Sequence, residues 1–170
     1  MEHVRHDQDL VLGVAPNARG FGFVVLEYPS MVLDWGAKRI GSKSEKRVER
    51  AIIGIFDRYQ PAAVICRVPG SKAERTSYSD LVLRMVADIA CNRDALLRME
   101  DGRGIAGHFA RHHGTRNKDD VARVVAGHFP ELRRLLPKRR RLWMSEHPTM
   151  GIFDAAAVLS WYLNAHNDSP

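Results

Sequence analysis

Three apolar segments joined by short turns constrain the fold of this chain more than any other feature. Residues 10–14 end at a Pro-Asn turn, residues 20–27 are aromatic and β-branched, and residues 31–40 follow a Tyr-Pro-Ser turn. Runs of this kind, bounded by turn residues, are typical of β-strands. Because the turns are short, we expect an antiparallel three-stranded meander, with Gly36 at a bulge in its third strand.

Helical and strand patterns alternate after this meander. Ser42 and Glu45 have the spacing of a capping box, and apolar residues then recur on one helical face as far as Tyr59. Residues 62–68 are apolar on both faces, which predicts a central strand. The later expected elements are a helix over 79–91, a strand over 95–99, a turn over 101–104, helices over 105–112 and 117–128, and a final helix from Thr149 to about residue 164.

This order of elements predicts an α/β fold in which one mixed sheet of five strands carries helices on both faces. In the helix over 79–91, we expect Leu83, Val86, Ala87 and Ala90 to face inward. A chain of 170 residues suits one domain with a proper core, so we expect a single domain over 1–170. The ends, 1–9 and 165–170, are expected to be flexible tails.

The charge of the chain favours a polyanion as its partner. The net charge is +6 and the sequence pI is about 9.7, and phosphates are the commonest dense negative charge in a cell. Six basic residues also lie within a stretch of nine, just before the final helix: Arg133, Arg134, Lys138, Arg139, Arg140 and Arg141. We therefore expect a nucleic-acid partner.

The sequence disfavours two further classes of protein, those that span a membrane and those stabilised by disulfides. No apolar run approaches the roughly 18 residues that a membrane-spanning helix needs, so we expect no membrane partner. Cys66 and Cys91 are too few for a disulfide framework, and Cys66 lies in an apolar run typical of a buried strand. We therefore expect a reducing, cytoplasmic setting.

Most other motifs of enzyme chemistry are missing from the sequence. His108 and His112 lie four residues apart on an expected helix, but no third zinc ligand is well placed near them. Contacts with solvent or phosphate are the simpler interpretation of these histidines. The glycines form neither a nucleophile elbow, nor a P-loop, nor a dinucleotide-binding fingerprint.

Four segments of the chain are similar to one known family. They are Gly13-Val14-Ala15-Pro16 with Gly20-Phe21-Gly22-Phe23, the strand at 61–68, the basic segment 114–121, and Asp154-Ala155-Ala156-Ala157. Their order and spacing resemble those of the RuvC-type Holliday-junction resolvases of the RNase H-like superfamily. The resemblance implies an RNase H-like sheet of three antiparallel strands followed by two parallel strands. It also implies a DNA partner, branched DNA included, and a homodimer.

The resemblance further implies a metal site, which this sequence does not match. Such enzymes use four carboxylates to hold two Mg²⁺ ions at the scissile phosphate. Their first aspartate corresponds to Ala15, their glutamate to Arg67, and the two acids of the last helix to Gly151 and Asp154. Asp154 alone remains as a vestigial ligand. Exchanging a glutamate for an arginine beside a divalent ion reverses an interaction of several kcal/mol, so we expect impaired catalysis and no bound metal cofactor.

The same resemblance and the positions of basic residues suggest which groups contact phosphates. In the order of the chain, these are Arg19, Lys72, Arg75, Arg116, Lys118, Lys138, Arg139, Arg140 and Arg141, and Arg67 could join them. Lys72 and Arg75 lie in the loop after the 62–68 strand, where open α/β sheets bind ligands. Lys118 lies in the first turn of a helix, whose N-terminus attracts phosphate. Trp143 either stacks on a base or anchors its loop to the core.

Three hypotheses follow from these residues. The first is a RuvC-like nucleic-acid-binding protein whose nuclease chemistry is lost or weak. The second is an active Mg²⁺-dependent endonuclease, in which Glu27, Asp34 or Glu146 replaces a missing ligand. Glu146 lies eight residues before Asp154 and reaches the same edge if the intervening loop folds back, although a solvated loop carboxylate is the simpler interpretation. The third is a dimeric interaction scaffold without a nucleic-acid role.

Overall fold

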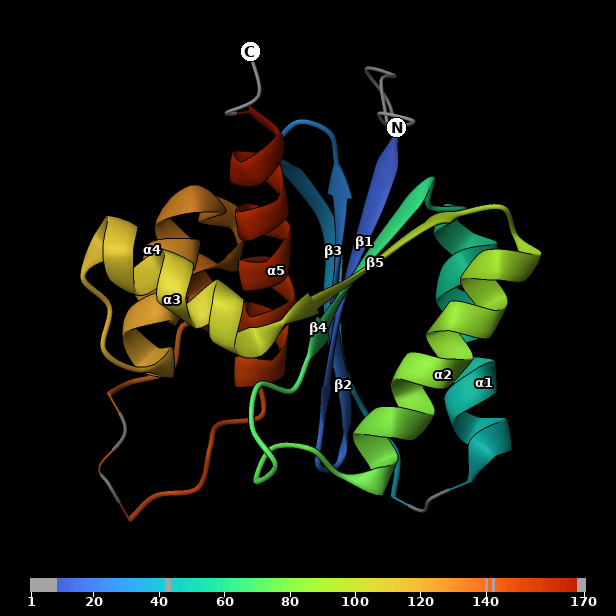
Figure 1. Ribbon diagram of the computed structural model, residues 1–170, viewed down its shortest axis with the longest axis horizontal. Coiled ribbons are helices and arrows are strands. Elements are labelled where there is room, and N and C mark those ends of the chain that lie inside the picture. Colours follow the sequence, from blue (N-terminus) through green and yellow to red (C-terminus); the bar gives the residue numbers. More distant parts are fainter. Residues whose placement is uncertain (1–8, 42–43, 140, 142, 168–170) are drawn as a thin grey trace.

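One five-stranded mixed sheet organises the chain (Figure 1). The computed structural model describes residues 9–41, 44–139, 141 and 143–167. Its elements are β1 (Leu10–Asn17), β2 (Gly20–Glu27), β3 (Met31–Arg39), α1 (Glu45–Tyr59), β4 (Ala63–Val68), α2 (Ser77–Asn92), β5 (Leu96–Asp101), α3 (Gly102–His113), α4 (Lys118–His128), the 3-10 helix η1 (Pro130–Leu135) and α5 (Met150–Asn167). The strand order is β3-β2-β1-β4-β5. The first three strands are antiparallel, and β4 and β5 run parallel to β1, so the predicted topology is confirmed.

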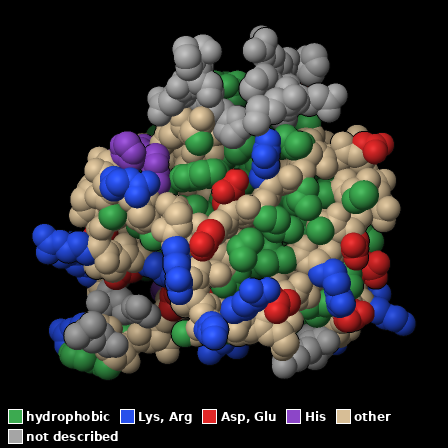
Figure 2. Space-filling model, viewed as in Figure 1, with side chains coloured by type: hydrophobic (Ala, Val, Ile, Leu, Met, Phe, Trp, Pro, Cys, Tyr) green, Lys and Arg blue, Asp and Glu red, His purple; other side chains and the backbone are tan. Residues whose placement is uncertain are grey.

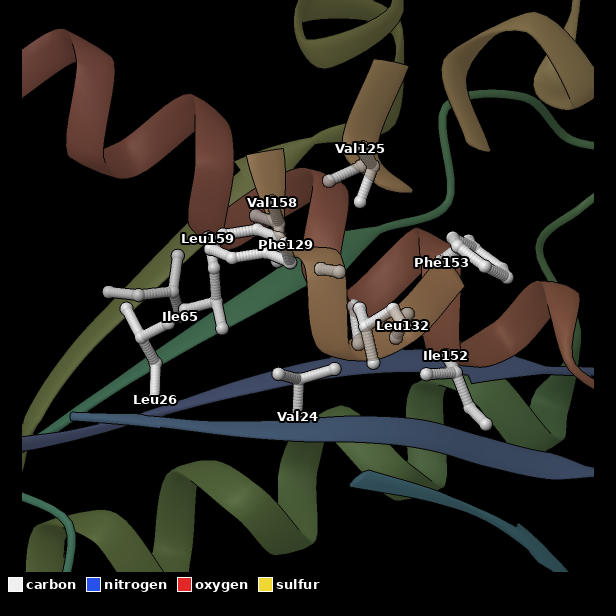
Figure 3. Packing of buried hydrophobic residues seen from close by; sticks show 14 of the residues in the cluster. Val24, Leu26, Ile65, Val125, Phe129, Leu132, Ile152, Phe153, Val158 and Leu159 are labelled. Atoms are coloured by element: carbon white, nitrogen blue, oxygen red, sulfur yellow. The ribbon is translucent and has the colours of Figure 1, made fainter. Parts of the chain in front are cut away.

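The sheet separates two hydrophobic cores. Helices α1 and α2 cover one face, and α3, α4, η1 and α5 cover the other (Figure 1). Helices α1 and α2 are amphipathic and bury one stripe each. Helix α5 is apolar on nearly all sides because it lies between the sheet and the outer helices, where little solvent reaches it. Figure 3 shows Leu159 and Val158 of α5 packed among residues of β4, α4 and η1.

Two glycines allow α5 to lie close against the sheet. A Cβ atom on Gly13 of β1 would come 2.7 Å from the carbonyl oxygen of Ala155, and one on Gly22 of β2 would come 2.0 Å from the carbonyl oxygen of Gly151. Real Cβ atoms do not approach backbone this closely, so only glycine fits at these positions. This packing fixes the N-terminal part of α5, which carries Asp154, over the ends of β1 and β2.

Some predictions of local structure were wrong. The bulge in β3 lies at Leu33, because Val32 pairs with Leu26 and Asp34 with Val25, whereas Gly36 pairs regularly with Phe23. Gly36 instead makes room for the ring of Phe23, which a Cβ atom there would meet at 2.7 Å.

The starts of two helices also differ from the prediction. Helix α1 has Ser44, not Ser42, at its N-cap, without a side-chain cap, and Ser42 lies outside the described residues. The expected turn at 101–104 is the start of α3, because the Asp101 carboxylate accepts the N–H of Arg103 and caps the helix.

The inner face of α2 and the chain ends differ as well. In α2 the buried stripe contains Val82 and Ile89, while Leu83 and Ala87 are only half-buried. At the C-terminus, α5 extends to Asn167, beyond the predicted end at about residue 164, and at the N-terminus the carbonyl of Asp9 accepts the N–H of Tyr28. Residues 1–8 and 168–170 lie outside the described part of the chain.

Candidate functional site

The candidate site lies where the carboxyl ends of β1 and β4 meet the N-terminal part of α5. Ala15 is near the end of β1 and Arg67 near the end of β4, and these parallel strands are neighbours. Asp154 lies one turn into α5, and Lys118 is the first residue of α4. Ligands bind at this edge in open α/β sheets because the loops that leave the strands converge there.

Lys118 lies among three carboxylates. Its Nζ atom is 3.2 Å from Asp154 Oδ2, 3.2 Å from Glu146 Oε1 and 4.0 Å from Glu74 Oε1. These acids come from α5, from the loop before α5 and from the loop after β4. An ammonium group with three hydrogen-bond donors therefore holds together carboxylates from three separate segments.

Arg67 is locked in place beside this lysine. Its Nη2 atom is 3.2 Å from Glu74 Oε2, and its side chain is only 11% exposed. The N–H of Gly70 donates to the same carboxylate oxygen at 3.2 Å. The guanidinium also lies against Gly102, where a Cβ atom would be 2.8 Å from Nη2. Arg67 is thus packed into the site, and its guanidinium cannot turn away without losing these contacts.

The pKa values follow from these contacts. For Lys118, burial alone would lower the pKa, but the charges of Asp154, Glu146 and Glu74 outweigh both burial and the repulsion from Arg67 and raise it. For Glu74, burial acts to raise the pKa, but Arg67, Lys118 and the Gly70 N–H together lower it. Both groups are therefore held in their charged forms around neutral pH.

The residues at this edge do not fit a pair of magnesium ions. Ala15 is an apolar side chain, 1% exposed, that faces the core under α5. Two fixed cations, Lys118 and Arg67, already pair with the three carboxylates around them and balance two of their three negative charges. Among the residues that the structure describes, no group of three or more His, Cys, Asp or Glu side chains is arranged to hold a metal ion. Mg²⁺ requires about six oxygen ligands in near-octahedral geometry, and the side chains of Ala15 and Arg67 supply none.

A cavity of about 400 Å³ opens beside the ion pairs and is rimmed by further cations. Arg19, Lys38 and Arg39 line it together with Arg67 and Lys118. The first three of these make none of the ion pairs seen among the described residues, and Lys38 lies 5.8 Å from the ring centroid of Phe23. The outer part of the cavity therefore carries positive charge that the three carboxylates do not neutralise.

The other residues predicted to contact phosphates lie at the turn between α3 and α4 and in the loops before α2 and α5. Arg116 lines a cavity of about 630 Å³ with Arg139 and Arg123, at the turn between α3 and α4. Arg75 pairs with Asp80 at 3.0 Å, and Arg139 lies 3.9 Å from Asp120. Lys72, Lys138 and Arg141 are exposed in loops, and Arg140 lies outside the described residues. On the face in Figure 2, basic side chains are interspersed with acidic ones and border an apolar area.

Of the acids considered as replacement ligands, only Glu146 reaches the site. Asp34 accepts a hydrogen bond from the Tyr59 hydroxyl, on the α1 side of the sheet. Glu27 is at the far end of β2, five residues beyond Gly22, which is about 17 Å along the strand. Sequence reasoning missed Glu74, because a loop carboxylate has no periodicity. Its one signal is its position in the loop after β4, seven residues from Arg67.

The fold has close counterparts among solved structures. RuvC of Thermus thermophilus in complex with a Holliday junction substrate superimposes with a TM-score of 0.68 over 94% of this chain and 96% of that chain, at 17% identity. The chain has the fold of a RuvC resolvase. A second T. thermophilus RuvC structure gives the same TM-score, and the yeast mitochondrial Holliday junction resolvase Ydc2 gives 0.64 at 12% identity over 93% of this chain and 79% of that chain. The sequence matches no protein-family model and no curated protein.

The RuvC-like fold is thus preserved over nearly the whole chain at low sequence identity. Helix α5, which carries Asp154, packs on β1, β2 and β4. No helix among the described residues is long and apolar enough to cross a membrane. The fold itself does not decide which chemistry occurs at the site, because that chemistry depends on the charged side chains at the edge of the sheet.

Proposed function

We propose that this chain is a RuvC-like nucleic-acid-binding domain that does not hydrolyse phosphodiesters by two-metal catalysis. One observation carries the proposal: the ammonium of Lys118 lies 3.2 Å from both Asp154 and Glu146, in the space where a cation between these acids would sit. A protonated lysine supplies positive charge, but it offers no coordination positions for a nucleophilic water or a leaving oxygen.

Arg67 adds a second barrier to divalent ions. A fixed guanidinium at about 5 Å repels a doubly charged ion by several kcal/mol, even at an effective dielectric constant near 20. The pairing with Glu74 and the contact with Gly102 prevent its side chain from turning away. A metal ion would have to displace Lys118 and tolerate Arg67 at the same time.

The DNA-binding part of the proposal is supported by the charge of the rim. Arg19, Lys38 and Arg39 line the cavity beside the ion-paired carboxylates, and the chain has a net charge of +6. Phosphate contacts give binding that weakens steeply with salt. T. thermophilus RuvC binds a Holliday junction with the same fold, so we propose branched DNA as the ligand of this chain too. A homodimer stays a prediction.

Electrophoretic mobility shift with a four-way junction, a duplex of equal length and a single strand tests the proposal. We expect binding without Mg²⁺ and a steep decrease in affinity between 50 mM and 200 mM salt, on the order of 10³-fold if six phosphates are contacted. Arg19→Ala together with Arg39→Ala should lower the salt dependence, whereas Arg84→Ala, on the exposed α2 surface beside Glu45, should not. Absence of any shift would leave the interaction-scaffold hypothesis.

A cleavage assay separates the proposal from the active-endonuclease hypothesis. We expect no cleavage of the junction in Mg²⁺ or Mn²⁺ at any protein concentration that binds it. Cleavage that disappears in Asp154→Asn and in Glu146→Gln would instead show that these acids act as relocated ligands. Isothermal titration with Mn²⁺ gives an independent readout, and a measurable affinity that requires Asp154 would refute the proposal.

A further inference from the structure

A tryptophan is exposed at the tip of the loop between η1 and α5. Trp143 is 77% exposed and follows Arg141 in a turn closed by the N–H of Met144, which donates to the carbonyl of Arg141 at 3.0 Å. In Figure 1 this loop projects away from the helices and the sheet. The structure thus excludes the alternative that Trp143 anchors the loop to the core. An indole is seldom left in water without a role, because it is among the largest apolar side chains.

The ring has one occupied face. The guanidinium carbon of Arg141 lies 5.4 Å from the centroid of the Trp143 ring, which is a cation–π distance. The other two tryptophans, Trp35 and Trp161, pack against the core under α5. Trp143 is therefore presented to solvent on a basic surface, with one face held by Arg141.

The loop is fixed to the body of the protein on both sides of this turn. Before it, Arg139 lies 3.9 Å from Asp120 of α4. After it, Glu146 pairs with Lys118 at 3.2 Å, and the Thr149 hydroxyl donates to the carbonyl of Leu135 at 3.1 Å. Glu146 is three positions after Trp143, so their Cα atoms are at most about 11 Å apart. The ring is consequently held close to the ion-paired site.

We propose that Trp143 and Arg141 form a stacking platform for one unpaired nucleobase, next to the ion-paired site. The inference rests on the proposed function, because it specifies how that nucleic-acid surface recognises its ligand. Every base has a π-face, which the open side of the indole contacts, while Lys138, Arg139 and Arg141 meet the phosphates on either side of it. A neutral apolar partner would not need this surrounding positive charge, and a cationic one would be repelled by it.

Binding of oligothymidine and of an abasic strand of equal length tests the platform, because the two strands share their phosphates and differ only in their bases. At one fixed salt concentration, we expect Trp143→Ala to weaken oligothymidine binding by about five- to 100-fold and abasic-strand binding by less than twofold. Trp143→Phe should recover most of the loss. Met144→Ala, which removes a neighbouring side chain that is 52% exposed, is the matched control and should change neither affinity.

The outcomes separate the platform from the proposed function. Equal weakening of both strands, or unchanged oligothymidine binding in Trp143→Ala, would overturn the platform while leaving phosphate-driven binding intact. If the wild-type protein binds neither strand but shifts the four-way junction, the platform fails and the proposed function stands, whereas binding to none of the three overturns both. A preference for oligothymidine that Trp143→Ala abolishes and Trp143→Phe restores would establish the platform, and far-UV circular dichroism should be identical for all variants, since Trp143 contributes no core packing.

Discussion

Two parts of α5 differ in what stabilises them: the face packed on the sheet and the charged end at Asp154. Along the packed face, a Cβ atom on Gly13 or Gly22 would meet the carbonyl oxygen of Ala155 or Gly151, so neither glycine can carry one without a shift of the backbone. Within the same stretch of the helix, Asp154 faces a pocket in which Lys118 and Arg67 lie among the carboxylates. Neighbouring residues of one helix are therefore held by different interactions, apolar packing on one side and ion pairs on the other.

The difference shows that this fold and the chemistry at its edge depend on different interactions. The apolar layer is stabilised by burial and by close backbone contact, which tolerate no added volume. The charged end is stabilised by pairing, and a lysine ammonium satisfies carboxylates without any metal ion. The position of α5 on the sheet is therefore set by apolar packing, and the cation at the edge of the sheet is set separately by charge pairing.

The strongest test of the packed face of α5 is Gly22→Ala. The new Cβ atom would lie 2.0 Å from the carbonyl oxygen of Gly151, so either α5 or β2 has to shift. We expect the free energy of unfolding to decrease by about 3 kcal/mol, at the upper end of overpacking effects, because backbone rather than a flexible side chain is in the way. Urea denaturation monitored by circular dichroism measures the change.

Gly54→Ala is the matched control for this substitution. Gly54 lies in the middle of α1 and is exposed, and a Cβ atom there meets nothing within 4 Å. Replacing an exposed helical glycine by alanine should raise stability by about 0.5–1 kcal/mol. Equal effects of the two substitutions would contradict the view that the backbone of α5 packs directly on β2 at Gly22.

Lys118→Met tests the charged end. The change leaves Asp154, which is only 16% exposed, without its cation and also strands Glu146. We expect a loss of about 2 kcal/mol at pH 7, less than for a fully buried pair because solvent reaches the lysine. Since the pKa of Lys118 is raised, its contribution is complete below its ordinary value of 10.5 and disappears only as the pH rises through the higher folded value.

The exposed Lys138 offers a control with the same chemical change. Lys138→Met should alter the free energy of unfolding by less than about 0.5 kcal/mol, as surface substitutions usually do. Both variants are compared with the wild type by urea denaturation at pH 7 and pH 9. A stable Lys118→Met protein would mean that the three carboxylates need no cation, and the analogy between the lysine and a metal ion would fail.

A smaller effect is expected for Glu74→Gln, which frees Arg67 from its partner. The lowered pKa of Glu74 means that its contribution is present above its ordinary value of 4.5 and is lost as the pH falls through the folded value. We expect the free energy of unfolding of the variant to be about 1 kcal/mol lower than that of the wild type from pH 8 to pH 5. The difference is this small because the Glu74 carboxylate is 37% exposed, and it should shrink below about pH 4.5. A difference independent of pH would contradict the charge pairing.

The sequence predicted the sheet and its helices because their signals are periodic. Strand runs such as 20–27 alternate with helical stripes such as Val48 and Ile52, and the order of these elements leaves few topologies. Predictions of local structure were wrong where a single contact decides the structure. Asp101 caps α3 directly after β5, and the bulge lies at Leu33 rather than at a glycine.

The site could be predicted only in part, because ion pairs between distant loops have no sequence pattern. Asp154 and Arg67 were identified by resemblance, and Lys118 by its position at a helix start, but nothing in the sequence states that Lys118 lies between Asp154 and Glu146. Glu74 was missed although it holds Arg67 in place. These contacts depend on how the loops before α2 and α5 fold back over the sheet edge, which is a tertiary property.

The smallest expected effect concerns the loop after β4, outside the ion-paired site. Arg75 is engaged by Asp80 at 3.0 Å, whereas no residue in the described part of the chain forms an ion pair with Lys72. If phosphates follow this loop, Lys72→Ala should reduce the slope of log affinity against log salt by about 0.9, the value for one phosphate contact, while Arg75→Ala should change it less. Arg75 has to leave Asp80 before it can contact a phosphate. Equal slopes for the two variants would therefore show that the Arg75–Asp80 ion pair opens on DNA binding.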